Sequence, residues 1–186
     1  ETLIKHRELL PANEAAVVEF ANWASVAKPS EIVTLPDDGA QRPDWKAFGG
    51  LLLTESIVGD IRTRLEKFQQ VGIRIPVRVR PKGDGRSEKM SFFTVYIGMC
   101  RDSGHRPIFL RDGIVITDIR CPQMSGTRSL VVIEEPALAG LLGDAEGVNH
   151  TQWQKDSPKF HNRYIYGGDT IKFRAVLDSC LDQSEP

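Results

Sequence analysis

The spacing of apolar residues along the chain changes at Gly72. Before this point, apolar residues recur at three- and four-residue intervals, as they do on one face of an amphipathic helix. After it, apolar residues at odd-numbered positions from Ile73 to Val79 alternate with arginines and a proline. This alternation is typical of a half-buried strand. The chain is therefore expected to place helices first and a sheet after them.

Two helices are predicted in the first seventy residues. The first begins near Asn13 and runs to about Ala27. The second begins after Thr54, a residue type that caps helices, and runs to about Gln70. Residues 31–49 contain several prolines and glycines and predict a long loop between the two helices. The apolar stripe of the second helix consists of Ile57, Ile61, Leu65 and Phe68.

About four strands are predicted beyond Gly72, and the first two are expected to form an antiparallel hairpin. Pro76 lies in the first strand and cannot donate a hydrogen bond, so this strand is expected at a sheet edge. A continuous apolar run near residue 131 is typical of a central strand. Pro136 is expected to begin a short helix that ends at Gly143, and a further helix is predicted after Asp169. The predicted strands cover residues 73–80, 91–99, 107–110 with 114–119, and 129–133.

These patterns predict an α+β fold, with N-terminal helices, a mainly antiparallel sheet of about four strands, and C-terminal helices. Residues 1–70 are expected to form a helical segment and residues 71–186 a β-rich module. The sequence is 40% hydrophobic and 26% charged, which suffices for a core and argues against disorder.

The chain shows neither a signal peptide nor an apolar run near the roughly 20 residues that a membrane helix needs. It begins at Glu1 without an initiator Met, so we expect a piece of a longer protein that does not enter a membrane. Three widely spaced cysteines do not predict a disulfide framework, which favours the reducing cytoplasm.

Charge is concentrated in the predicted sheet. Residues 74–111 contain nine Lys/Arg and three Asp/Glu, a net charge of +6. A basic strand face beside aromatic residues can bind a nucleic-acid backbone and stack bases. The favoured interpretation is instead a solvated outer face whose arginines pair with acids. The candidate nucleic-acid-binding residues are Arg74, Arg78, Arg80, Lys82, Arg86 and Tyr96.

A second candidate site is a cluster of oxygen and imidazole side chains. Asp144, Glu146 and His150 lie close together in sequence after the helix predicted at Pro136, and such side chains can hold a divalent metal ion. An alternative role for Asp144 is to cap a helix or stabilise a turn. Neither a phosphate-binding glycine loop nor a nucleophile elbow is present, so no catalytic residue is assigned.

Two sequence segments resemble the C-terminal region of large bacterial proteins whose N-terminal part is a GHKL ATPase, the fold of histidine kinases, gyrase and heat-shock chaperones. One segment is Phe109-Leu110-Arg111-Asp112-Gly113-Ile114. The other is Leu141-Leu142-Gly143-Asp144-Ala145-Glu146, followed by His150, Thr151, Trp153, Lys159-Phe160 and Tyr164-Ile165-Tyr166-Gly167.

The resemblance implies a region downstream of an ATPase, with ATP and Mg²⁺ bound by another part of the parent protein and no cofactor bound here. We therefore expect a non-catalytic, transducer-like module whose partners are the other domains of its parent. A nucleic-acid-binding module and a metal-dependent enzyme are the alternatives.

Overall fold

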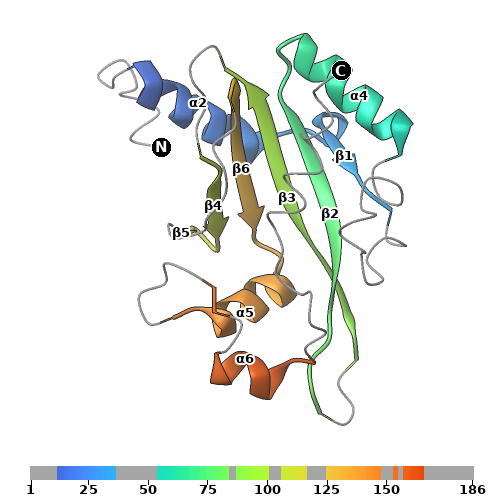
Figure 1. Ribbon diagram of the computed structural model, residues 1–186, viewed down its shortest axis with the longest axis vertical. Coiled ribbons are helices and arrows are strands. Elements are labelled where there is room, and N and C mark those ends of the chain that lie inside the picture. The colour runs from blue at the N-terminus through green and yellow to red at the C-terminus, as the bar shows by residue number, and fades with distance from the viewer. Residues whose placement is uncertain are drawn as a thin grey trace.

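The computed structural model describes residues 12–36, 54–83, 87–100, 106–116, 125–147, 153–154 and 157–165. Among these residues, six strands form one mixed sheet in the order β1-β2-β3-β6-β4-β5 (Figure 1). The predicted α+β class is confirmed, but the sheet is larger than the expected four strands. The strands are β1 (Ile32–Thr34), β2 (Val71–Val79), β3 (Lys89–Met99), β4 (Ile108–Arg111), β5 (Ile114–Ile116) and β6 (Thr127–Ile133).

The predicted hairpin and central strand are both confirmed. β2 and β3 are antiparallel along their whole length, from the pair Val71 and Ile97 to the pair Val79 and Lys89. β6 lies inside the sheet between β3, to which it is antiparallel, and β4, to which it is parallel. The sheet is therefore mixed rather than mainly antiparallel, since β1 is also parallel to β2.

β1 lies within residues that were expected to form a loop, and it covers part of the edge of β2. Leu35 donates its backbone N–H to the carbonyl of Arg74 at 2.9 Å. In a parallel ladder the next hydrogen bond would come from the N–H of residue 76. Pro76 lacks this donor, so the ladder stops there. The prediction that β2 lies at the sheet edge was therefore wrong, since β1 pairs with it from Gly72 to Arg74. From Pro76 onward, no described strand pairs with this side of β2.

Helices cover both faces of the sheet. On one face α2 (Ala12–Val26) packs through Phe20 and Ala24 onto Tyr96 and Leu130. The opposite face carries the larger core and is covered by three helices. These are α4 (Glu55–Glu66), α5 (Pro136–Ala145) and α6 (Pro158–Arg163), while a short 3₁₀ helix, η2 (Pro29–Glu31), connects α2 to β1.

The cap predicted at Thr54 is confirmed, but α4 is shorter than expected. Thr54 accepts a hydrogen bond from the N–H of Ile57 at 3.3 Å. At the other end Phe68 adopts a φ of 57° and its neighbour Gln69 donates back to the carbonyl of Arg64. This is the left-handed ending of a Schellman motif. Phe68 is 63% exposed, so it does not belong to the apolar stripe.

α5 begins at Pro136 as predicted, and Glu135 caps it by accepting a hydrogen bond from the N–H of Ala137. It continues to Ala145, so Gly143 lies inside the helix and does not end it. The helix α6 was not predicted, although Pro158 in its first turn is a common helix start.

Within the described residues, no helix is both long and apolar enough to cross a membrane. The predicted helix after Asp169 lies outside these residues. The boundary expected at residue 70 stays a prediction, although α2 and β1 both pack on the sheet that follows it.

Candidate functional site

The arginines of β2 share one face with the aromatic residues of β3, as the alternating sequence predicts. Arg74 lies opposite Thr94, and Arg78 lies opposite Met90. Phe92 lies between these two pairs, opposite Pro76. Directly opposed residues of antiparallel strands point to the same side of a sheet. The basic residues and Phe92 therefore lie together on the face that α2 covers only in part.

Tyr96 belongs to the covered part of this face. It is 8% exposed and packs edge-on against Trp23 of α2, with 5.4 Å between the ring centroids. Burial raises the pKa of the Tyr96 phenol, and the nearby Arg74 opposes this shift. Since its ring is packed beneath α2, Tyr96 does not present a free stacking surface.

Arg74 marks the point where the covered part gives way to the open part. Its guanidinium carbon lies 4.4 Å from the centroid of the Phe92 ring, in a cation–π contact. Both side chains are half-buried. Within the described part of the chain, no hydrogen-bond acceptor lies within reach of the Nε atom of Arg74.

Two further arginines of this face hold one carboxylate. Arg78 donates to Oε1 of Glu88 at 2.8 Å, and Arg80 donates to Oε2 of the same side chain. The hydrogen bonds from Arg80 and then Arg78 hold the pKa of Glu88 below its usual range. The favoured interpretation of the sequence, pairing of the arginines with an acid, is confirmed for these two residues.

The other candidates on the basic face lie at or beyond the end of β2. The Nζ atom of Lys82 donates to the carbonyl of His161, which ties the lysine to α6. Its backbone N–H donates to the carbonyl of Arg163 at 2.7 Å. Arg86 lies outside the described residues. The structure therefore places Arg74, Arg78 and Arg80 on one face and turns Lys82 toward a helix.

Glu146, one of the candidate metal ligands, forms a buried ion pair with Arg111. Arg111 ends β4 and donates through Nε and Nη2 to the two carboxylate oxygens, the second at 2.9 Å. The side chains are 10% exposed for Arg111 and 1% for Glu146. The indole N–H of Trp153 also donates to Glu146 at 3.3 Å. Trp153 in turn packs edge-on against Phe109.

Asp144 holds different partners at the end of α5. Both of its carboxylate oxygens accept from one guanidinium nitrogen of Arg163, each at 3.0 Å. The hydroxyl of Tyr164 donates to the same carboxylate at 3.2 Å. Among the described residues, no group of three acidic, histidine or cysteine side chains is placed to hold a metal ion. His150 lies outside them, so the metal site stays a prediction.

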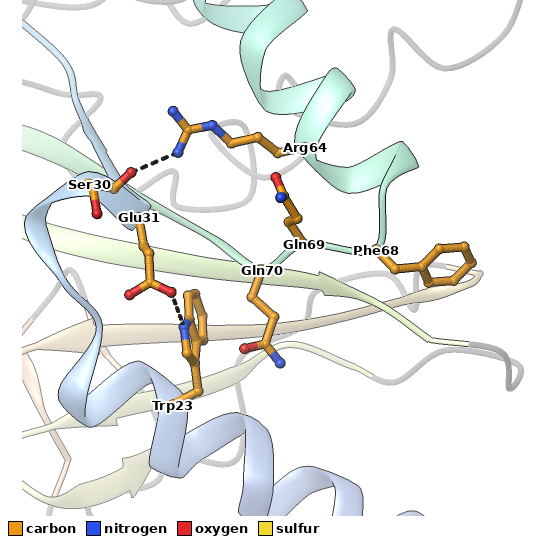
Figure 2. Close-up of a pocket in the computed structure, with 7 residues that line it drawn as sticks. All are labelled: Trp23, Ser30, Glu31, Arg64, Phe68, Gln69 and Gln70. Carbon is orange, nitrogen blue, oxygen red and sulfur yellow. Dashed lines mark hydrogen bonds between the residues drawn. The ribbon is translucent and has the colours of Figure 1, made fainter.

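A cleft of about 400 Å³, which the sequence did not predict, lies where η2 meets the end of α4 (Figure 2). The indole of Trp23 points to Glu31 and donates to it at 3.0 Å. Arg64 donates to the carbonyl of Ser30 at 2.9 Å, while the ring of Phe68 points away from the other labelled side chains. No local motif signals this cleft, because its residues come from α2, η2, α4 and the turn that follows α4. The lining residues are Trp23, Ser30, Glu31, Arg64, Phe68, Gln69 and Gln70.

Comparisons of the chain with protein-family models, with curated proteins and with solved structures found no significant match.

Proposed function

We propose that this chain is a non-catalytic, transducer-like module of a larger cytoplasmic ATPase-like protein of the GHKL type. ATP and Mg²⁺ would bind to another domain of that parent, and the other domains would be the partners of this one. The proposal starts from the two segments that resemble the C-terminal region of such proteins.

The observation that carries the proposal is the ion pair between Arg111 and Glu146. One residue comes from each of the two segments, and the buried pair joins the last residue of β4 to the end of α5. Phe109 and Trp153, also from these segments, pack against each other beside it. These four residues of the two segments thus connect the sheet to the end of α5. A buried connection of this kind between a strand and a helix suits a module that transmits a conformational change from one domain to the next.

The module is tested with Mg²⁺-ATP and the chain of residues 1–186. Thermal unfolding with and without millimolar nucleotide should give the same midpoint, and phosphate release should equal that of a blank without protein. Ligand that binds the folded state raises its apparent stability by mass action, so a clear rise in the midpoint would contradict the proposal. Hydrolysis that survives further purification would contradict it as well.

A second candidate function is binding of single-stranded nucleic acid by the basic face. The observation that favours it is the contact of Arg74 with Phe92 on the open part of the sheet. Aromatic rings and guanidinium planes are the groups on which unpaired bases stack, and neighbouring arginines supply contacts to the backbone. Charge on this face exceeds what Glu88 neutralises, because one carboxylate faces both Arg78 and Arg80.

This second function predicts salt-dependent binding of single-stranded oligonucleotides. Replacing Arg74 by Ala should weaken binding, because it removes both the guanidinium that packs on Phe92 and one positive charge of the basic face. Arg62→Ala on α4 is the matched control, because it removes the same charge from an exposed helix position outside the basic face. An affinity that is equal in both variants, or no binding at low salt, would dismiss this function.

A further inference from the structure

The end of the β2–β3 hairpin places two arginines around one carboxylate. Arg78 and Arg80 are separated by one residue in β2 and its continuation, and both donate to the side chain of Glu88 just before β3. In Figure 1 the lower ends of these strands lie beside α6, and the N–H of Ile165 donates to the carbonyl of Arg80 at 2.8 Å. The three side chains are partly open to solvent, with exposed fractions of 26% for Arg78, 55% for Arg80 and 32% for Glu88.

This arrangement matches the recognition of an anion with several oxygens. Guanidinium groups bind carboxylates and phosphates through the same fork of N–H donors. Each guanidinium has five such donors, and the contacts to Glu88 use only part of this capacity. Two guanidiniums around one carboxylate also leave a surplus of positive charge.

We propose that Arg78 and Arg80 form a phosphate-binding site for the backbone of single-stranded nucleic acid, and that Glu88 occupies this site in the free protein. Glu88 then acts as an internal competitor that a backbone phosphate displaces. The inference rests on the second candidate function and adds to it the phosphate subsite and the residue that masks it.

The position of Arg74 relative to this site supports a nucleic acid over a free anion. Arg74 precedes Arg78 by four residues on the same face of β2, which corresponds to roughly 13 Å along the strand. A single-stranded nucleic acid with one phosphate at Arg78 and Arg80 can therefore extend along this face to the contact between Arg74 and Phe92. One extended face then offers a phosphate subsite at one end and a stacking subsite at the other.

Displacing Glu88 from the two arginines is expected to cost little free energy. Ion pairs with this degree of exposure contribute little to stability, because water and salt already screen them. A phosphodiester also brings its own negative charge, so the arginines exchange one anion for another and stay paired. Removal of the Glu88 charge should accordingly expose the site without disturbing the fold.

The test is fluorescence anisotropy with a labelled pyrimidine oligonucleotide of about 15 nucleotides at low salt. Glu88→Gln should bind about threefold to tenfold more tightly than the unchanged chain. The slope of log K against log salt should be steeper by about 0.7 to 1.4, which corresponds to one or two added phosphate contacts on a single strand. Glu88→Asp keeps the charge on a shorter side chain and should bind with intermediate affinity. The gain should disappear when Arg78 and Arg80 are both replaced by Gln in the Glu88→Gln background.

Asp60→Asn is the matched control, since it removes an equally charged partner of an arginine on α4. If Glu88→Gln binds no more tightly than Asp60→Asn while the unchanged chain binds, the masking role is overturned and the nucleic-acid function stands. If neither the unchanged chain nor Glu88→Gln binds, the function itself fails. Two results support the inference: binding that appears only in Glu88→Gln, and binding that is tighter in Glu88→Gln but not in Asp60→Asn.

Discussion

Arg111 and Glu146 form a two-point ion pair between the end of β4 and the end of α5, and both side chains are almost fully buried. A buried pair contributes little net stability when intact, because both charges lose their hydration. Removing one partner is different, since it leaves the other charge buried and uncompensated. Arg111→Met should therefore lower the free energy of unfolding by about 3–5 kcal/mol, measured by urea denaturation.

Two further variants control this first prediction. Arg163→Met removes an arginine whose side chain is 61% exposed, and it should cost less than about 1 kcal/mol. The double variant Arg111→Met with Glu146→Leu leaves neither charge of the buried pair and should recover a large part of the loss, since the remaining carboxylate partner of Arg111, Asp112, is 53% exposed. A cost of Arg111→Met no greater than that of Arg163→Met would contradict the buried pairing.

Gly143 gives the Arg111 guanidinium room against α5. A Cβ atom at this position would lie 3.3 Å from Nη1 of Arg111, whereas a Cβ at Gly140 would meet no atom within 4 Å. Both glycines lie inside the same helix, so alanine improves helix propensity equally at each. Gly140→Ala should stabilise the protein by about 0.5–1 kcal/mol. The stabilisation by Gly143→Ala should be smaller than this by about 1 kcal/mol, because the added Cβ crowds the Arg111 guanidinium. An equal rise in the thermal unfolding midpoint for the two variants would contradict this contact.

Phe68 ends α4 in a left-handed conformation that bulky side chains adopt at a cost. Its φ is 57° and its side chain is 63% exposed, so little apolar burial compensates the strain. Phe68→Gly should raise the free energy of unfolding by about 0.5–1 kcal/mol, because glycine adopts this conformation freely. Phe68→Ala removes the same ring and keeps the backbone strain, so it should bring no gain. Equal stabilities of the two variants in urea would argue against the strain.

Glu31 should make stability depend on pH. The indole N–H of Trp23 and the backbone N–H of Lys28 donate to its carboxylate and hold its pKa below the usual range. The unfolded chain then takes up its proton at a higher pH than the folded chain does. The stabilising contribution is complete above the ordinary glutamate pKa of about 4.3 and is lost as pH falls through the lower folded value.

The measurement is the difference in unfolding midpoint between the unchanged chain and Glu31→Gln. This difference should be constant near neutral pH and should shrink in acid. Trp23→Phe removes the indole N–H that donates to Glu31, so the same comparison made in that background should show a weaker pH dependence. A difference that stays the same from neutral pH to pH values well below about 4.3 would refute the assignment.

Metal binding by the candidates Asp144, Glu146 and His150 can be tested directly. The two carboxylates already hold Arg163 and Arg111, so a metal ion would have to displace an arginine from each. We expect no stoichiometric metal in the purified chain by elemental analysis, and no change in unfolding midpoint with Mg²⁺, Mn²⁺ or Zn²⁺. A rise in the midpoint that His150→Ala abolishes would establish the metal site instead.

Sequence patterns predicted the elements that depend on local spacing. The alternation after Gly72 predicted that Arg74 and Phe92 lie on the same face of the sheet, and Thr54 marked the start of α4. The three-residue strand β1 was missed because it is too short for a periodic signal and depends on its pairing with β2. Gly143 was predicted to end the helix. The structure shows that it instead leaves space for the guanidinium of Arg111, a residue of a distant strand that local sequence does not reveal. Ion pairs and the cleft near Trp23 likewise require the tertiary fold.

Sequencing the coding region upstream of Glu1 tests whether this chain belongs to a larger ATPase-like protein. We expect a GHKL domain there, with the acidic and asparagine-bearing helix that binds Mg²⁺-ATP and a glycine-rich lid over the nucleotide. A start codon close to Glu1, or an upstream domain that lacks both motifs, would contradict it.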